Sequence, residues 1–172
     1  MRVIAGDFGG RKLVTPEGTT TRPTTDKVRQ AVFNSLTSMG VLEGAVAADL
    51  YAGSGALGIE ALSRGAATCT FVERDRGALN ALRENLKALQ IEDRADIRAT
   101  DVMAWAPAMR NVDIAFVDPP YDFDHWHELL GLLDVGLVVA ESDQAVEAHP
   151  GYAVLRARRY GRTWVTLLER LA

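Results

Sequence analysis

Cysteine is almost absent from this sequence, because Cys69 is the single one among 172 residues. One thiol excludes a disulfide within the chain, and its apolar setting in "TCTFVE" predicts a small buried side chain rather than a nucleophile. Histidine is nearly as scarce: there are three, and none has ligand spacing with a cysteine or carboxylate cluster. We therefore expect no metal site.

Long apolar runs are missing as well. No stretch approaches the roughly 20 apolar residues that span a bilayer, and "MRVIAGDFGG" lacks the long apolar segment expected of a secretory signal. We expect no membrane contact and a cytoplasmic location. With 48% hydrophobic and 24% charged residues, the composition is that of a globular domain with one sizeable core, and we expect a monomer.

An overall excess of positive charge is also absent, since the net charge is −4. The distribution is uneven: residues 1–30 carry +3, residues 31–155 carry −11 and residues 156–172 carry +4. If the two basic ends meet in space, they form a local positive face that can neutralise a few phosphates. An ordinary solvated surface is the other reading of the same charges.

What the sequence does contain is an alternation of apolar runs and helix-period segments, which is typical of parallel βαβ units. Leucines 79, 82, 86 and 89 place one apolar face on a helix that packs on the sheet. After Pro150, two strand-like runs joined at Tyr160 and Gly161 predict an antiparallel hairpin at one edge, and hence a mixed sheet. The expected parallel strands are 45–50, 68–73, 95–100, 112–118 and 136–141.

The segment before the first parallel strand has a different character. Residues 1–40 are expected to form an extension made of a small β-hairpin around Gly9 and Gly10, a Thr/Pro-rich stretch, and a helix capped by Thr24 or Thr25. The apolar face of that helix would hold Val28, Val32, Leu36 and Met39. Residues 41–172 would form the main domain, packed with the extension as one compact unit.

A glycine loop follows the first parallel strand, in "DLYAGSGALGIEAL". Gly53, Gly55 and Gly58 have the GxGxxG spacing, which permits a tight turn and lets a cofactor approach the backbone at a helix N-terminus. Glu73 ends the next strand 20 residues on, where an acid can accept ribose hydroxyls. A nicotinamide or flavin dinucleotide would satisfy this spacing equally, and so would a turn needed only for packing.

Two further acids favour a cofactor without a pyrophosphate. Asp49 ends the first strand, where it could meet a positively charged amino-acid group, and Asp101 follows the third strand, where it could accept from an adenine amine. Each alone could be a capping carboxylate. Acids at the ends of consecutive strands are consistent with S-adenosylmethionine.

The motif "DPPY" ends the fourth strand. Asp118 and the carbonyl of Pro119 are acceptors, and the two prolines offer no competing donors, so an exocyclic amine of a nucleobase could be held there. Tyr121 supplies a flat face for stacking. The pattern indicates methyl transfer aided by orientation and by electrostatic stabilisation; the other reading is a plain strand exit with a packed tyrosine.

At these residues the chain resembles the RsmD family of bacterial 16S ribosomal RNA guanine-N2 methyltransferases. The resemblance covers nearly the whole length, through "GRKL", "RPTTDKVRQAVFNSL", "DLYAGSGALGIEALSRGA", "VERD", "DPPY" and "YGRTWVTLLE". It implies a Rossmann-like fold, S-adenosylmethionine as donor, and a guanine of 16S rRNA, free or in the small ribosomal subunit, as acceptor. Tyr51 departs from the pattern, because relatives often have phenylalanine there.

Carried over by position, the resemblance implies roles for individual residues. Asp118, Pro119 and Tyr121 would be catalytic. The cofactor would be held by Asp49, Tyr51, Gly53, Ser54, Gly55, Glu73, Arg74, Asp101 and Val102. The RNA would be held by the extension of residues 1–40 and by the terminal hairpin, through Arg11, Lys12, Arg22, Thr24, Arg29, Arg156, Arg158, Arg159 and Arg162.

Two other functions fit parts of the pattern. An adenine-N6 methyltransferase acting on DNA would also use "DPPY", although no additional domain for reading DNA is evident. A non-catalytic nucleotide-binding protein, such as an NAD-dependent regulator, would use only the glycine loop.

Overall fold

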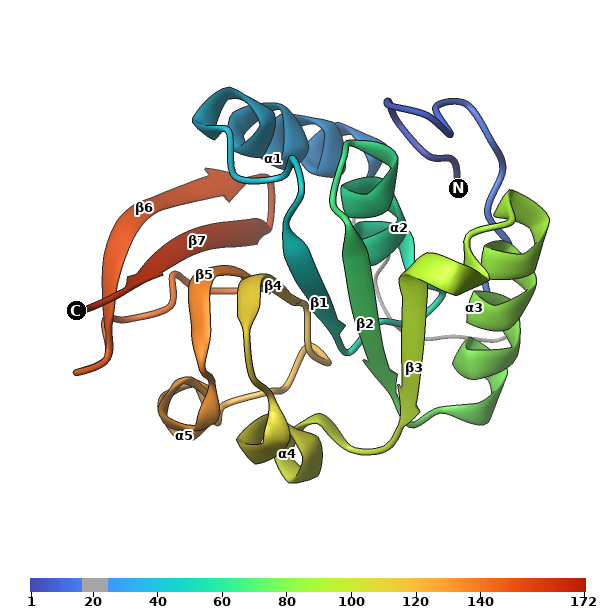
Figure 1. Ribbon diagram of the computed structural model, residues 1–172. Helices are drawn as coiled ribbons and strands as arrows, with labels where there is room; N and C mark the ends of the chain where they lie inside the picture. Colours follow the sequence, from blue (N-terminus) through green and yellow to red (C-terminus); the bar gives the residue numbers. More distant parts are fainter. Residues whose placement is uncertain (17–24) are drawn as a thin grey trace.

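A single seven-stranded mixed sheet forms the centre of the computed structural model, which describes residues 1–16 and 25–172 (Figure 1). The strand order is β3-β2-β1-β4-β5-β7-β6; the first five strands are parallel, and β7 runs antiparallel to both β5 and β6. This confirms the predicted Rossmann-like α/β fold with a C-terminal hairpin. The strands are β1 Val46–Leu50, β2 Thr68–Glu73, β3 Ala95–Ala99, β4 Val112–Val117, β5 Val135–Ser142, β6 Tyr152–Tyr160 and β7 Thr163–Arg170.

Helices cover both faces of the sheet. One core cluster joins α1, α2 and α3 to the sheet, and a second joins α4 and α5 to the opposite face. The predicted leucine face of residues 79–89 is confirmed, since all four leucines are buried. The helices are α1 Asp26–Met39, α2 Ala56–Ser63, α3 Arg76–Leu89, α4 Val102–Trp105 and α5 Trp126–Leu132, with short 3₁₀ turns η1 Glu92–Arg94 and η2 Ala106–Ala108.

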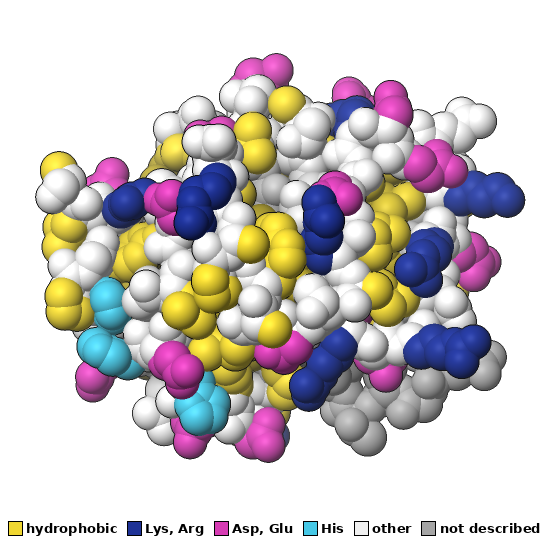
Figure 2. All heavy atoms as spheres, turned by 60° about the horizontal axis from the view of Figure 1, so that its bottom comes forward, with side chains coloured by type: hydrophobic (Ala, Val, Ile, Leu, Met, Phe, Trp, Pro, Cys, Tyr) yellow, Lys and Arg dark blue, Asp and Glu magenta, His cyan; other side chains and the backbone are white. Residues whose placement is uncertain are grey.

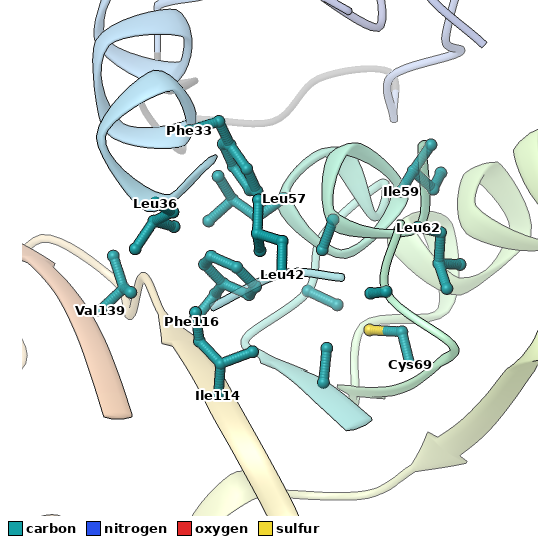
Figure 3. Packing of buried hydrophobic residues seen from close by; sticks show 14 of the residues in the cluster. Phe33, Leu36, Leu42, Leu57, Ile59, Leu62, Cys69, Ile114, Phe116 and Val139 are labelled. Carbon is teal, nitrogen blue, oxygen red and sulfur yellow. The ribbon is translucent and has the colours of Figure 1, made fainter. Parts of the chain in front are cut away.

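In the first core cluster, α1 packs against the middle of the sheet (Figure 3). Phe33 of α1 stacks on Phe116 of β4, with ring centroids 5.1 Å apart and planes 26° apart. Cys69 lies in the same cluster and is 1% exposed, so the prediction of a small buried side chain is confirmed. The packing fixes α1 over the strand that leads to "DPPY".

Helix α1 begins where its sequence predicts, and its apolar face has one exception. Thr25 is the N-cap and accepts from the Val28 N–H, and Gly40 closes the C-terminus in the left-handed region at φ 71°. Met39, however, is 43% exposed, so its placement on the buried face was wrong. It is the last helical residue, just before the Gly40 cap.

The N-terminal arm, by which we mean residues 1–16, lies beside α2 and α3 (Figure 1). It folds back through one antiparallel bridge between Arg2 and Lys12, with Val3 N–H donating to the Arg11 carbonyl at 2.9 Å. The expected hairpin is therefore present as a single bridge rather than two strands. Its buried Val3 shares a core cluster with α2, while the division of the chain at residue 40 stays a prediction.

The strand ends differ from the predictions by one residue at most: β1 starts at Val46, β3 ends at Ala99, β4 ends at Val117 and β5 spans 135–142. Backbone pairing decides these ends. Within the described residues, no helix is both long and apolar enough to cross a bilayer.

Candidate active site

The glycine loop and the "DPPY" segment leave the sheet side by side. Strands β1 and β4 are parallel neighbours, and their last pair is Leu50 with Val117. The next residue of β1 opens the glycine loop, and the next residue of β4 is Asp118. The carboxyl ends of neighbouring parallel strands are where open α/β sheets bind ligands, so this edge is the candidate site.

The three positions of the GxGxxG spacing need glycine for two reasons, backbone conformation and close packing. Gly53 and Gly55 have φ values of 58° and 89°, in the left-handed region that favours glycine. A Cβ on Gly58 would lie 2.4 Å from the Phe71 ring, so this glycine allows α2 to approach β2. A Cβ on Gly53 would point into open space, which makes the turn a cradle for a ligand that approaches the backbone.

Asp49 is a buried acid beneath the loop. Its side chain is 1% exposed, and one carboxylate oxygen accepts from the Gly58 N–H at 2.8 Å. Burial raises the pKa of Asp49 well above its usual range; the Gly58 bond opposes the shift, and the negative charges of Asp118, Glu73 and Glu141 add to it. A cationic ligand would relieve this cost, so the site suits a positively charged group.

Glu73 organises the loop from the end of β2. Its two carboxylate oxygens accept from three backbone N–H groups: Gly53 at 2.8 Å, and Arg74 and Asp75 at 2.9 Å each. Each oxygen has two lone pairs, and Oε1 already accepts two of these bonds, so Oε2 retains acceptor capacity for one further donor. The predicted ribose contact of Glu73 stays a prediction, and the structure adds its hold on the Gly53 turn.

Arg74 and Asp101 follow the ends of the paired strands β2 and β3 and face each other. Asp101 caps α4 by accepting from the Ala104 N–H at 3.2 Å, and its other oxygen lies 3.5 Å from the Arg74 guanidinium. Both side chains are well exposed. Val102 is 2% exposed within the second core, and Ser54 is 7% exposed, so these two predicted cofactor residues offer a ligand mainly their backbone.

Tyr51 joins the two halves of the site. It has a φ of 62°, a rare conformation for a residue with a side chain, and its ring meets Phe123 edge to face with centroids 5.6 Å apart. Burial, followed by the charge of Asp101, raises the pKa of Tyr51 to about 12, with Arg74 opposing. The hydroxyl therefore stays neutral at physiological pH.

The "DPPY" segment forms a turn in which the Phe123 N–H donates to the Pro120 carbonyl at 2.9 Å. The charge of Asp118 acts on Asp49, so both acids belong to one site. Tyr121 is 69% exposed, which leaves its ring accessible to a base. The catalytic roles of Asp118, Pro119 and Tyr121 stay predictions.

Sequence reasoning missed two residues of this site. Phe123 anchors the turn, packing edge to face on Tyr51 and on Trp126, the latter at 5.2 Å. Glu141 is 4% exposed on β5, in the row directly beyond the pair of Val117 and Ala140, and hence level with Asp118. The signal for Glu141 was available, because it too is an acid near the end of a strand.

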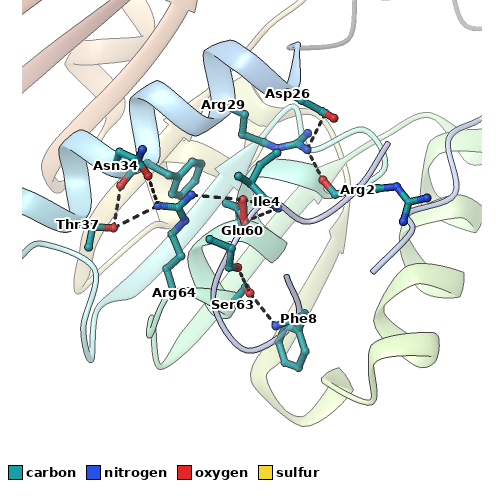
Figure 4. A network of polar contacts seen from close by, with 12 residues as sticks. Arg2, Ile4, Phe8, Asp26, Arg29, Asn34, Thr37, Glu60, Ser63 and Arg64 are labelled. Atoms are coloured by element: carbon teal, nitrogen blue, oxygen red, sulfur yellow. Dashed lines mark hydrogen bonds and ion pairs between the residues drawn. The ribbon is translucent and has the colours of Figure 1, made fainter. Parts of the chain in front are cut away.

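The residues predicted to contact RNA fall into three groups. Those of the arm and the hairpin are exposed, whereas Arg29 of α1 is buried, so the prediction for it was wrong. Arg29 is 1% exposed, and its guanidinium donates to the Arg2 carbonyl and pairs with Asp26 at 3.0 Å (Figure 4). Arg22 and Thr24 lie outside the described residues. The exposed ones are Arg11, Lys12, Arg156, Arg158, Arg159 and Arg162.

Figure 2 brings forward the edge of the sheet at which β1, β2 and β3 end. Hydrophobic side chains gather near its centre, Lys and Arg are spread over its upper and right parts, and the histidines lie at its lower left. Among residues 1–16 and 25–172, no three His, Cys, Asp or Glu side chains are grouped as metal ligands. The surface on this side is mixed in charge.

A left-handed glycine cradle above a buried acid, with further acids at the next strand ends, fits a nucleoside cofactor that carries a cationic amino-acid part. The fold and this site define an S-adenosylmethionine-dependent methyltransferase. Comparison with solved structures agrees: that of YhhF from Escherichia coli superposes with a TM-score of 0.86 at 35% identity, covering 100% of this chain and 98% of the other.

Sequence comparisons identify the family. Residues 1–169 match the family model described as "Conserved hypothetical protein 95". YlbH of Bacillus subtilis is 40% identical, covering 99% of each chain. Ribosomal RNA small subunit methyltransferase D of E. coli is 38% identical, covering 83% of this chain and 75% of that protein. The chain belongs to this family, the RsmD family, which confirms the resemblance seen in its motifs.

Proposed function

We propose that the protein methylates the exocyclic N2 amine of a guanine in small-subunit ribosomal RNA, as a cytoplasmic monomer. The observation that carries the proposal is the adjacency of the glycine loop and Asp118 on parallel neighbours β1 and β4. The substrate class rests on the E. coli relative, whose name states small-subunit ribosomal RNA.

In this proposal, Asp118 and the Pro119 carbonyl accept the two N–H groups of the amine and orient its nitrogen toward the glycine loop. The bound cofactor supplies a methyl group on an electrophilic sulfonium. The nitrogen would take the methyl group and leave the sulfonium as a neutral thioether. The Asp118 carboxylate would stabilise the positive charge that develops on the nitrogen and accept one N–H proton, which restores a neutral amine. Tyr121 stacks on the base and limits its rotation.

The sheet register supports an RNA path from the hairpin to this amine. Arg158 pairs with Val165, which pairs with Glu141, and Glu141 is level with Asp118. Three inter-strand spacings of about 4.8 Å put Arg158 roughly 14 Å from Asp118. Arg158 and Arg156 also lie beside Ser35 of α1. A phosphate near these arginines would be a few nucleotides from a base in the site.

The test is methyl transfer from labelled S-adenosylmethionine to unmodified small subunits and to free rRNA, followed by mass spectrometry of the nucleosides. We expect N2-methylguanosine. N6-methyladenosine, or label only in DNA, would contradict the acceptor assignment.

Asp118→Ala is the matching variant. It should bind S-adenosylhomocysteine nearly as the wild type does and lose most turnover, because its partner is the acceptor amine. Equal loss of binding and turnover would remove Asp118 from that role. Calorimetry with NAD and S-adenosylhomocysteine separates a nucleotide-binding regulator, which would bind only the former.

A further inference from the structure

One buried amide joins the glycine loop to the N-terminal arm. Asn85, 2% exposed in the middle of α3, donates from Nδ2 to the Ser54 carbonyl at 3.0 Å and to the Val14 carbonyl at 2.9 Å. Its Oδ1 accepts from the Val14 N–H at 2.7 Å. The partners fix the amide orientation, since a flipped amide would set its NH₂ against the Val14 N–H.

The rest of the arm is tied to α2, the helix that begins at the glycine loop (Figure 4). Glu60 is fully buried and accepts from the Ile4 N–H at 2.8 Å, while Ser63 accepts from the Phe8 N–H at 3.0 Å. Arg11, a predicted RNA contact, donates to the Ala88 carbonyl of α3 at 3.0 Å. The arm thus rests on α2 and α3, through the buried Glu60 and Ser63 of α2 and through the bond from the exposed Arg11 to α3.

Among these ties, only Asn85 bonds to the glycine loop itself. Ser54 lies between Gly53 and Gly55, so its carbonyl belongs to the turn that a cofactor would order. An ordered Ser54 carbonyl holds the Asn85 amide in place, and the same amide holds both backbone groups of Val14. Buried, satisfied polar contacts have few alternative geometries, which suits them to transmit order.

We propose that Asn85 is a positioning residue that couples the cofactor loop to the N-terminal arm. Filling the cofactor site steadies the arm and its basic residues Arg11 and Lys12, and a ligand held by the arm strengthens cofactor binding in return. The link from loop to arm stands on the contacts alone. Its consequence for RNA rests on the proposed function.

Hydrogen exchange tests the link without any RNA. In the wild type, saturating S-adenosylhomocysteine should slow exchange of the arm amides, above all that of Val14, by about 5-fold or more, the lower end of typical coupling. In Asn85→Ala, the same saturation should protect the glycine loop but leave exchange of the arm amides unchanged. Asn80, exposed on the same helix, gives the matched control: Asn80→Ala should behave as the wild type.

Two results would overturn the coupling. One is a wild type that binds S-adenosylhomocysteine without any slowing in the arm. The other is slowing in the arm of Asn85→Ala equal to that of the wild type. If the alanine variant does not fold, Asn85→Asp replaces it, because the aspartate keeps the volume and the acceptor but loses both donors, and the same two criteria apply.

The RNA consequence has a separate readout. The affinity of the wild type for small-subunit rRNA should be about 5-fold higher with S-adenosylhomocysteine than without it. In Asn85→Ala, the ratio of these two affinities should fall to about 1. A ratio equal to that of the wild type in the variant would overturn the inference. Absence of any RNA binding alongside an arm that responds to S-adenosylhomocysteine would reject the proposed substrate and leave the coupling supported.

Discussion

Tyr51 and Phe123 meet edge to face, with ring centroids 5.6 Å apart and planes 62° apart. Tyr51 opens the glycine loop, and Phe123 closes the "DPPY" turn by donating its N–H to the Pro120 carbonyl. This contact therefore sets the separation between the residues that would hold the cofactor and those that would hold the amine.

Removing the ring of Phe123 should loosen that separation. We expect Phe123→Ala to lower kcat by about 10-fold while cofactor affinity changes little, because each lost aromatic pair contributes about 0.5–1.5 kcal/mol. Single-turnover kinetics and calorimetry measure the two effects. Tyr51→Phe, which keeps the ring, is the control and should match the wild type; unchanged kcat in Phe123→Ala would argue against a spacing role.

The charged side chain of Asp49 should destabilise the fold, although it favours binding of a cationic ligand. Its folded pKa is raised above the unfolded value of about 3.9, so the folded state holds this proton more tightly. Stability should fall as pH rises between these two pKa values, and the loss should persist above the folded one. In Asp49→Asn this contribution to the pH dependence should vanish.

Urea denaturation of both proteins from pH 4 to pH 8 measures that difference. At the same time, Asp49→Asn should bind S-adenosylmethionine more weakly by about 1.5–3 kcal/mol, the usual range for a hydrogen bond to a charged group. If Asp49→Asn is less stable than the wild type at every pH, or binds S-adenosylmethionine with unchanged affinity, Asp49 is not a buried acid that binds a cationic group.

Glu73 should matter for the order of the loop as well as for the ligand. Glu73→Ala removes the acceptor of three backbone N–H groups, among them that of Gly53, and should weaken cofactor binding by about 1.5–3 kcal/mol. Glu73→Gln keeps one oxygen and should lose less. Calorimetry with S-adenosylhomocysteine provides the comparison, and equal affinity in all three proteins would count against the assignment.

Substitution of Tyr121 should reduce RNA methylation without destabilising the fold. Its ring is 69% exposed, so Tyr121→Ala should change the free energy of unfolding by no more than about 0.5 kcal/mol. The loss of a stacking platform should weaken RNA methylation by roughly 1–3 kcal/mol in kcat/KM. Tyr121→Phe retains a stacking ring and should keep most activity; a phenylalanine variant as poor as the alanine one would exclude stacking.

Substitutions of Arg29 and Arg158 should distinguish a residue that stabilises the fold from one that binds RNA. Arg29→Ala breaks a buried charged hydrogen bond to the arm and should destabilise the fold by about 1.5–3 kcal/mol. Arg158→Ala, at an exposed site, should leave stability nearly unchanged and reduce the slope of log affinity for RNA against log salt by about 1. Reversed outcomes would mean that the two arginines were assigned wrongly.

Much of the fold could be predicted from the local sequence, because the signals for caps and helix faces depend on residues only a few positions apart. Thr25 caps α1 through a side chain three residues from its donor, and the leucines of α3 share a face by helical period alone. The acids at strand ends were readable for the same reason. Arg29 was misread because its charge looked suited to phosphate, whereas packing between α1 and the arm buries it.

The succession of strands and helices along the chain, the glycine turn and the "DPPY" turn could all be predicted from the sequence, because the φ restrictions of glycine and proline and the periodicity of apolar residues act over a few positions. The level position of Glu141 and Asp118, the contact of Phe123 with Tyr51, and the link from Ser54 through Asn85 to Val14 became visible in the folded chain alone. These contacts join residues 23 to 72 positions apart, and they depend on strand register and helix placement, which side-chain packing selects.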